Sequence, residues 1–202
     1  MPNCLQSPIY PRVVSFKKGK RLLLRFLNLV DLEEIVKLFL EALEDDLCWL
    51  KEDFRDPRVG HRWLEELRQR RVLALAAVDL QEHRFAAGGH LRLGRDSARH
   101  VGEIRLFVSA PFRGLGLGSL LLRELRELAL DEDLKWLQTE VVARHREAVN
   151  FFQAHGFEVN AVLKDYFLRH NGETHDVALM LHPVMQEFGK FSYPEEKPAK
   201  IG

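Results

Sequence analysis

Three alternating glycines between two apolar stretches constrain this chain more than any other feature. Residues 113–119 read Arg-Gly-Leu-Gly-Leu-Gly-Ser, between an apolar run that ends at Val108 and a leucine-rich run that begins at Leu120. The first run has the length of a strand and the second has helical periodicity, so the glycines occupy a strand-to-helix turn. Glycine there lets backbone N–H groups approach a ligand at the positive end of the helix dipole. The loop therefore predicts an anion site, and phosphate suits it best.

The spacing of the loop separates several kinds of phosphate site. A P-loop requires lysine after its last glycine, and no lysine follows Gly118. A dinucleotide fingerprint counted from Gly114 requires glycine where Ser119 stands. An ordinary glycine-rich turn without a ligand stays open, because short glycine patterns often arise by chance. Counted from Arg113, the loop reads Arg-x-x-Gly-x-Gly and resembles the pyrophosphate-binding loop of the GNAT superfamily of acetyl-CoA-dependent N-acetyltransferases.

Segments on both sides of the loop resemble the same superfamily. Glu103-Ile-Arg-Leu-Phe-Val108 and the following Pro111-Phe112-Arg113 resemble the strand and entry turn ahead of the GNAT loop. Further on, Ala148-x-x-x-Phe152-x-x-x-Gly156-Phe157 resembles its second signature, a helix that closes with Gly-Phe. Residues 165–180 resemble its last two strands. Several ordered signatures are harder to obtain by chance than one.

The expected order of helices and strands fits this resemblance. Strands are expected at residues 13–16 and 21–26 (as a hairpin, or as one strand after an extension), 72–78, 85–93, 101–108, 134–142, 157–168 and 174–181. Helices are expected at residues 28–42 or 31–42, from residue 57 or 58, from about 119 to 130, and from 146 or 147 to 155. The resemblance implies an α/β (α+β) GNAT fold, with one mixed, mostly antiparallel sheet between helices on both faces. We expect an N-terminal extension over 1–20, the N-acetyltransferase domain over 21–182, and a partly mobile tail over 183–202.

Composition excludes several classes of protein. With 202 residues, 46% of them apolar, the chain can bury one substantial core or at most two small ones. Its 30 basic and 30 acidic residues cancel, so no overall field favours nucleic acid or an anionic membrane. Cys4 and Cys48 suit neither a disulfide scaffold nor a zinc site. No apolar run approaches the ~18 residues of a membrane span. We expect a cytoplasmic protein without nucleic-acid, membrane or metal partners.

The resemblance implies acetyl-CoA as the cosubstrate and assigns its contacts. The loop would give backbone N–H groups to the pyrophosphate, with side-chain contacts from its first and last residues: Arg113, Gly114, Leu115, Gly116, Leu117, Gly118 and Ser119. In the superfamily the strand before the loop is splayed from its neighbour, and its backbone binds the pantetheine amides. That edge would be Leu106, Phe107 and Val108. On the second-signature helix, Asn150 would bond the pantetheine arm, and His145 is a candidate phosphate or adenine contact.

The acid–base residues are where the sequence departs from the superfamily. Many members carry glutamate six residues before the valine, whereas Glu103 is five residues before Val108. Strand alternation then places Glu103 on the opposite face, unless a β-bulge intervenes. Glu103 remains our candidate for the general base or the anchor of a basic water. The usual tyrosine acid is replaced by Phe152, which has no proton to donate, and Tyr166 is our candidate substitute, ahead of Asn150 and His155.

The sequence predicts an N-acetyltransferase that moves an acetyl group from acetyl-CoA to a primary amine by direct transfer in a ternary complex. The sequence does not distinguish between small amines, aminoglycosides, polyamines and protein N-termini as the acceptor. It also leaves open whether the protein forms a homodimer. Asp45, Asp46, Glu52 and Asp53 would attract a cationic amine or form a solvated face. Phe152 favours the alternative of a catalytically silent acyl-CoA-binding sensor or interaction domain. The missing third glycine disfavours a nucleotide-binding oxidoreductase.

Overall fold

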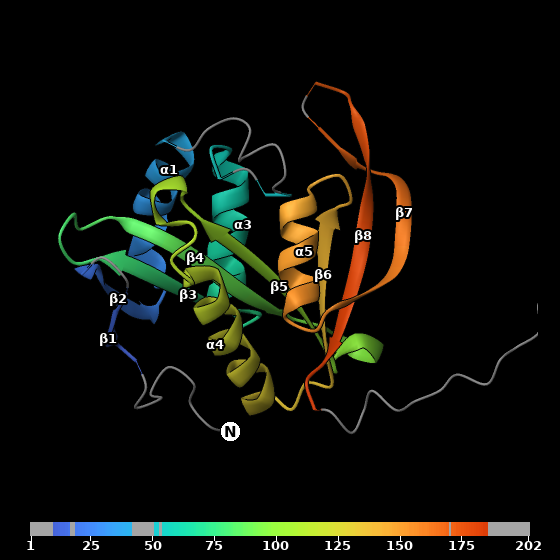
Figure 1. The fold of residues 1–202 in the computed structure, drawn as a ribbon, viewed down its shortest axis with the longest axis horizontal. Helices are drawn as coiled ribbons and strands as arrows, with labels where there is room; N and C mark the ends of the chain where they lie inside the picture. The colour runs from blue at the N-terminus through green and yellow to red at the C-terminus, as the bar shows by residue number, and fades with distance from the viewer. Residues whose placement is uncertain (1–9, 17–18, 42–50, 53, 170, 186–202) are drawn as a thin grey trace, which may run out of the picture.

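Eight strands form one mixed sheet in this computed structural model, which describes residues 10–16, 19–41, 51–52, 54–169 and 171–185. The strands pair in the order β1-β2-β3-β4-β5-β6-β8-β7, and only the pairing of β5 with β6 is parallel (Figure 1). In chain order they are β1 (Arg12–Ser15), β2 (Arg21–Phe26), β3 (Val72–Asp79), β4 (Phe85–Leu93), β5 (Val101–Val108), β6 (Trp136–Val142), β7 (Glu158–Leu168) and β8 (Thr174–Pro183).

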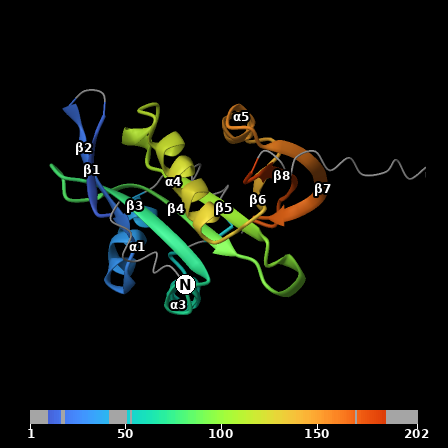
Figure 2. The same cartoon turned by 90° about the horizontal axis from the view of Figure 1, so that it is seen from below.

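Helices cover both faces of this sheet. They are α1 (Leu32–Glu41), α3 (Pro57–Arg68), α4 (Leu117–Asp131) and α5 (Arg146–Ala154). In Figure 2, α1 and α3 lie on one side of the strands and α4 and α5 on the other. The expected fold class, a mixed and mostly antiparallel sheet between two helical layers, is confirmed.

The apolar run at β3 is continuous because both faces of this strand are covered. Alternate residues of a strand point to opposite faces of its sheet. One set packs in the apolar cluster beneath α1 and α3, and contains Val72, Ala74 and Ala76. The other packs in the larger cluster beneath α4, and contains Leu73, Leu75 and Ala77. The two cores lie back to back across the sheet.

Strand β1 lies in the segment that the sequence assigned to an N-terminal extension. It pairs with β2 from Arg12↔Leu24 to Ser15↔Arg21, so the hairpin interpretation holds. Just before it, the hydroxyl of Tyr10 donates to Oε2 of Glu124 in α4 at 2.7 Å. The folded sheet therefore begins before the boundary expected at residue 21, because the hairpin supplies its edge strand.

The sheet is split between its two parallel strands. β5 pairs with β6 at only three positions, from Val101↔Trp136 to Glu103↔Gln138. Beyond them β5 stays with β4 as far as Val108, whereas β6 stays with β8. The helical layer divides along the same line, since α4 packs on β4 and β5 while α5 packs on β6 and β7 (Figure 1).

Candidate active site

A cleft opens where β5 and β6 separate. It is lined by the end of β5, the glycine loop, the start of α4, and by β6 and α5, and it encloses about 450 Å³. Small-molecule sites commonly enclose about 300–1,000 Å³. The cleft brings together most of the residues that the sequence assigned to the cofactor: Leu106, Phe107, Val108, Arg113, Gly114, Gly116, Leu117, Gly118 and Ser119.

The backbone of β5 points polar groups into this cleft. The Ser109 N–H donates to the Ala86 carbonyl at 3.0 Å, which fixes the alternation of bonds between β4 and β5. Phe107 is therefore one of the residues that exchange bonds with β4, whereas Leu106 and Val108 point their N–H and C=O groups toward the gap. Consistently, the Val108 carbonyl accepts from Nε of Arg113 at 3.0 Å. Of the three predicted edge residues, Phe107 lines the cleft with its side chain alone, because its backbone groups bond to β4.

The glycine loop delivers the first turn of α4 to one end of the cleft. Gly114 and Gly116 have φ of 71° and 87°, in the left-handed region that favours glycine. Gly116 is the N-cap of α4, and no side chain caps the helix there. The first N–H groups of a helix have no partners within it. They lie at the positive end of the helix dipole, so this terminus suits an anion.

Ser119 is held by a histidine at the end of α5. Its Oγ lies 2.9 Å from Nε2 of His155, and Nδ1 of the same ring lies 2.8 Å from the Phe151 carbonyl oxygen. Since Nδ1 faces an acceptor, it carries the hydrogen, and in the neutral ring Nε2 accepts from the serine hydroxyl. His155 therefore orients Ser119, a role that the sequence did not suggest for it.

Two predicted cofactor residues do not line the cleft. Asn150 is exposed on α5. It is two residues beyond Ala148, which does line the cleft, and two helical residues turn the side-chain direction by about 200°. Leu115 instead packs against the apolar cluster beneath α4. The Asn150 side chain is therefore not in place for the contact we expected, whereas the contact expected of Leu115 uses its backbone N–H.

Glu103 faces the side of β5 that carries Arg105 and Phe107. The β4–β5 register runs without a bulge from Ala87↔Val108 to Leu93↔Gly102, so Glu103 and Val108 point to opposite faces. Its Oε1 accepts from Nε and Nη2 of Arg105 at 3.0 and 2.6 Å. Burial opposes ionisation of Glu103, but the nearby cations, Arg105 foremost, outweigh it and hold the pKa of this carboxyl below its usual value.

Phe152, at the position of the usual acid, and Tyr166, its candidate substitute, lie in different surroundings. Phe152 is buried, with its ring edge-on to Phe151 and Phe157 at centroid distances of 5.2 Å. Tyr166 is 56% exposed on β7, and Nζ of Lys51 lies 5.5 Å from its ring centroid. The cleft is lined by Phe167 rather than by Tyr166. Tyr166 thus lies near a residue of the cleft without forming part of its wall.

An ion pair at the split was missed from the sequence. Lys51, just before α3, pairs with Glu140 on β6, and both line the cleft. Lys51 also lines a second pocket on the α1 and α3 side of the sheet. It comes from a mixed charged stretch with no motif, so only the tertiary structure identifies it. The pair connects the two halves of the divided sheet.

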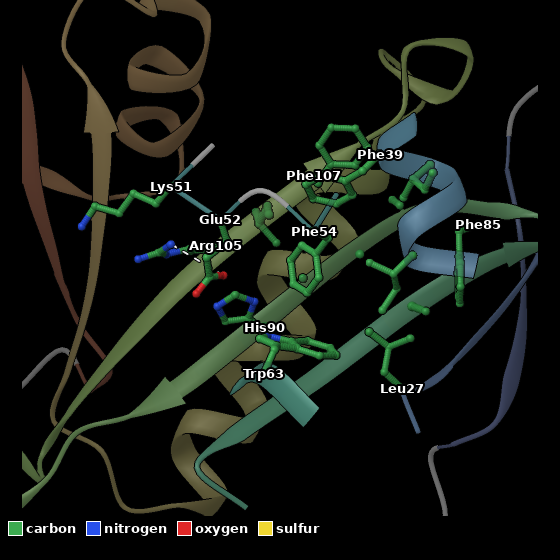
Figure 3. Close-up of a pocket in the computed structure, with 17 residues that line it drawn as sticks. Leu27, Phe39, Lys51, Glu52, Phe54, Trp63, Phe85, His90, Arg105 and Phe107 are labelled. Carbon is green, nitrogen blue, oxygen red and sulfur yellow. Dashed lines mark ion pairs between the residues drawn. The ribbon is translucent and has the colours of Figure 1, made fainter. Parts of the chain in front are cut away.

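The second pocket adjoins the cleft through β5. It encloses about 100 Å³ between α1, α3 and strands β3 to β5, and shares Lys51, Arg105, Leu106 and Phe107 with the cleft (Figure 3). Glu52 lines it and accepts from Nη2 of Arg92 at 2.7 Å. Burial opposes ionisation of Glu52, but Arg105 and its other neighbours hold its pKa below the usual value. Asp45, Asp46 and Asp53, also considered for this groove, lie outside the described residues.

His90 contributes an imidazole ring to the pocket. It is 8% exposed, and burial lowers its pKa to about 4, so the ring is neutral near pH 7. The charged groups that act on it are Glu52, Arg105, Arg92 and Glu103. In the part of the chain that the structure describes, no three His, Cys, Asp or Glu residues gather as a metal site. Within the same residues, no helix is long and apolar enough to cross a membrane.

Known proteins share the fold of this chain. The profile of the acetyltransferase (GNAT) family matches residues 32–157. A GNAT-family acetyltransferase of Streptococcus pneumoniae is 25% identical, with a TM-score of 0.65 over 80% of this chain and 99% of its own. A ribosomal-protein-alanine N-acetyltransferase of Brucella melitensis is 26% identical, with a TM-score of 0.68 over the same shares. A phosphinothricin acetyltransferase of Sinorhizobium meliloti, solved with acetyl-CoA, is 20% identical and shares the fold, with a TM-score of 0.67 over 80% of this chain and 88% of its own.

The family profile covers more than half of the chain, and it spans the glycine loop, the split between β5 and β6, and the closing Gly156-Phe157. The chain belongs to the acetyltransferase (GNAT) family.

Proposed function

We propose that this protein transfers an acetyl group from acetyl-CoA to a primary amine directly, with both substrates bound at once. The observation that carries the proposal is the pair of adjoining pockets on either side of β5. The cleft ends on the glycine loop, and the smaller pocket meets it at Arg105, Leu106 and Phe107. Two substrates held in adjoining sites gain the orientation that a bimolecular transfer requires.

The residues of the cleft fit acetyl-CoA. The first N–H groups of α4 suit its pyrophosphate. The outward N–H and C=O groups of Leu106 and the outward N–H of Val108 suit its pantetheine amides, which would extend β5 like an added strand. When bound, acetyl-CoA supplies the thioester that carries the acetyl group. An N–H of β5 near Val108 would then donate to the thioester oxygen and favour attack by the amine.

Glu103 is the proposed acceptor of the amine proton, through a water molecule. Arg105 keeps its carboxylate ionised, which makes it a weak base but a good hydrogen-bond acceptor for an ordered water. Tyr166 is the proposed donor of a proton to the leaving thiolate. An ordinary thiol has a pKa of about 8.5, so the thiolate leaves readily near neutral pH and the donor assists without being essential.

A catalytically silent acyl-CoA-binding protein is a second candidate. Buried Phe152 stands at the position of the usual acid, and it favours this reading because it cannot donate a proton. Calorimetry with acetyl-CoA, followed by thiol release across an amine library, separates the candidates. Amine-dependent release of CoA supports the transferase, and binding without release from any amine supports the silent protein. Absence of acetyl-CoA binding would refute both.

A further inference from the structure

The small pocket has aromatic walls. Gly88, His90, Arg105 and Phe107 occupy one face of β4 and β5, because Gly88↔Phe107 and His90↔Arg105 are opposite pairs. Phe39 of α1 stacks on Phe107 with centroids 5.7 Å apart. Phe54 meets Phe39 and Trp63 edge-on, at 5.0 and 5.4 Å. Figure 3 shows Phe39, Phe54 and Phe107 grouped on one side, with His90 beside Trp63.

The volume of this pocket limits its occupant. It encloses about 100 Å³, less than the ~150 Å³ of an apolar cavity that admits benzene. A compact chain of a few methylene groups therefore fits better than a sugar ring or a folded peptide. Apolar walls favour an occupant whose surface is also apolar.

Two buried polar atoms in this pocket lack a partner. Trp63 Nε1 and His90 Nε2 have no hydrogen-bond partner in the described part of the chain. Trp63 is 3% exposed and His90 8%, so bulk water does not serve them. An indole N–H only donates, whereas a neutral imidazole nitrogen donates or accepts according to its tautomer. A hydroxyl group matches both atoms, since it accepts from the indole and pairs with either tautomer of the imidazole.

The carboxylates around the pocket are already paired with cations. Arg92 contacts Glu52 and Glu66 at 2.7 and 3.0 Å. Glu103 is bound by Arg105, and Glu140 by Lys51. Each of these carboxylates contacts a cation, although Glu52, Glu66 and Glu103 share the two guanidinium groups of Arg92 and Arg105. A second ammonium group entering the apolar walls would lose its hydration and compete with Arg92 and Arg105 for carboxylates that they already contact, which is unfavourable.

We infer that the acceptor is a primary monoamine with a compact apolar body that ends in a hydroxyl group, and that this body fills the pocket between Phe39, Trp63, Gly88 and His90. The inference rests on the proposed function, which supplies the amine as acceptor. It excludes diamines, polyamines and aminoglycosides as preferred substrates.

Three amines of equal chain length test the inference. Pentylamine, 5-amino-1-pentanol and cadaverine differ only in the far group, which is a methyl, a hydroxymethyl or a second aminomethyl. We expect kcat/KM at least about tenfold lower for cadaverine than for pentylamine, and about threefold or more higher for aminopentanol. Cadaverine equal to pentylamine would overturn the apolar pocket. Pentylamine equal to or better than aminopentanol would overturn the hydroxyl contact.

Two variants assign the effects to the pocket. A Cβ at Gly88 meets only the Leu75 carbonyl oxygen, at 3.5 Å, which is an ordinary contact, and Gly88→Val adds two further methyl groups at a residue that lines the pocket. We expect it to weaken all three amines while acetyl-CoA affinity stays unchanged, with Gly88→Ala as a milder matched control. Trp63→Phe keeps a ring but removes the N–H, and should abolish only the preference for aminopentanol. Normal amine kinetics in Gly88→Val would place the acceptor elsewhere.

A binding measurement keeps this test independent of turnover. If none of the three amines releases CoA, the proposed function fails for this amine class, and calorimetry of aminopentanol with the CoA-saturated protein then decides the pocket. Binding that Gly88→Val abolishes supports the inference. No binding, or equal binding to wild type and Gly88→Val, refutes it.

Discussion

A methyl group at Gly118 tests the course of the cofactor through the cleft. A Cβ there would lie 3.3 Å from two ring carbons of Phe151 and 3.8 Å from Cγ2 of Val108. These side chains belong to α5 and β5, so the methyl group of Gly118→Ala would stand between the two walls of the cleft. We expect the dissociation constant of acetyl-CoA to rise at least tenfold, which corresponds to about 1.4 kcal/mol.

The same substitution should leave the fold almost unchanged. Alanine is favoured over glycine by up to about 1 kcal/mol within a helix. The Phe151 ring must give way by a few tenths of an ångström, which offsets part of that gain. The free energy of unfolding of Gly118→Ala, measured by urea denaturation, should therefore stay within about 1 kcal/mol of wild type.

Gly116→Ala is the matched control, because its physical effect is the reverse. A Cβ at Gly116 meets nothing within 4 Å, but its φ of 87° strains any residue other than glycine. That strain costs about 1–2 kcal/mol. Gly116→Ala should lose more stability than Gly118→Ala. Its affinity for acetyl-CoA should fall less than that of Gly118→Ala. Wild-type affinity in a folded Gly118→Ala protein would refute passage of the cofactor between Val108 and Phe151.

Three further predictions concern proton transfer and pH. Glu103→Gln should lower turnover by roughly 10²-fold in steady-state kinetics with little change in acetyl-CoA affinity; full activity across the pH profile would move the base elsewhere. Phe152→Tyr should raise turnover or shift its pH optimum, whereas Tyr166→Phe should lower it, and an unchanged Tyr166→Phe would remove the phenol from the mechanism. The pKa of His90 is about 4 in the folded protein, against an ordinary value of 6.5, so the unfolded chain binds more protons between these pH values. The free energy of unfolding should therefore fall by roughly 3 kcal/mol as pH drops from 6.5 to 4. Urea denaturation of His90→Gln should show an unfolding free energy that depends less steeply on pH over this range.

Local sequence signals were sufficient for most of the fold. Helical periodicity and apolar runs of strand length gave the described helices and strands to within a few residues. The glycine spacing located the start of α4, although the helix begins at Leu117 rather than near Ser119. The backbone at position 116 has a φ of 87°, which favours glycine. Because this requirement is local, it can be recognised in the sequence.

Contacts between distant segments left no such pattern. The pairing of Lys51 with Glu140, 89 positions apart in the sequence, depends on how the segment before α3 meets β6. Burial of His90 and Trp63 in one pocket depends on the packing of α3 on the sheet. Asn150 was misplaced because a two-residue shift, harmless in a motif, turns a helical side chain to the opposite side. Sequence periodicity reports which face is buried, but not which partner covers it.

The three-residue junction between β5 and β6 also bears on how this protein unfolds. A junction of three residue pairs is a weak boundary within an eight-stranded sheet. Segments on the two sides of such a boundary tend to unfold locally as separate cooperative units. In the free protein, the Leu106 and Val108 amides should therefore exchange with solvent deuterium quickly, while the Phe107 amide, bonded to β4, exchanges slowly. A ligand that extends β5 would protect those two amides and link β6, β7 and β8 more firmly to the rest of the sheet. The two halves of the sheet, which open separately in the free protein, would then open together when the cofactor is bound. The bound cofactor would thus take the place of the missing strand pairing between β5 and β6.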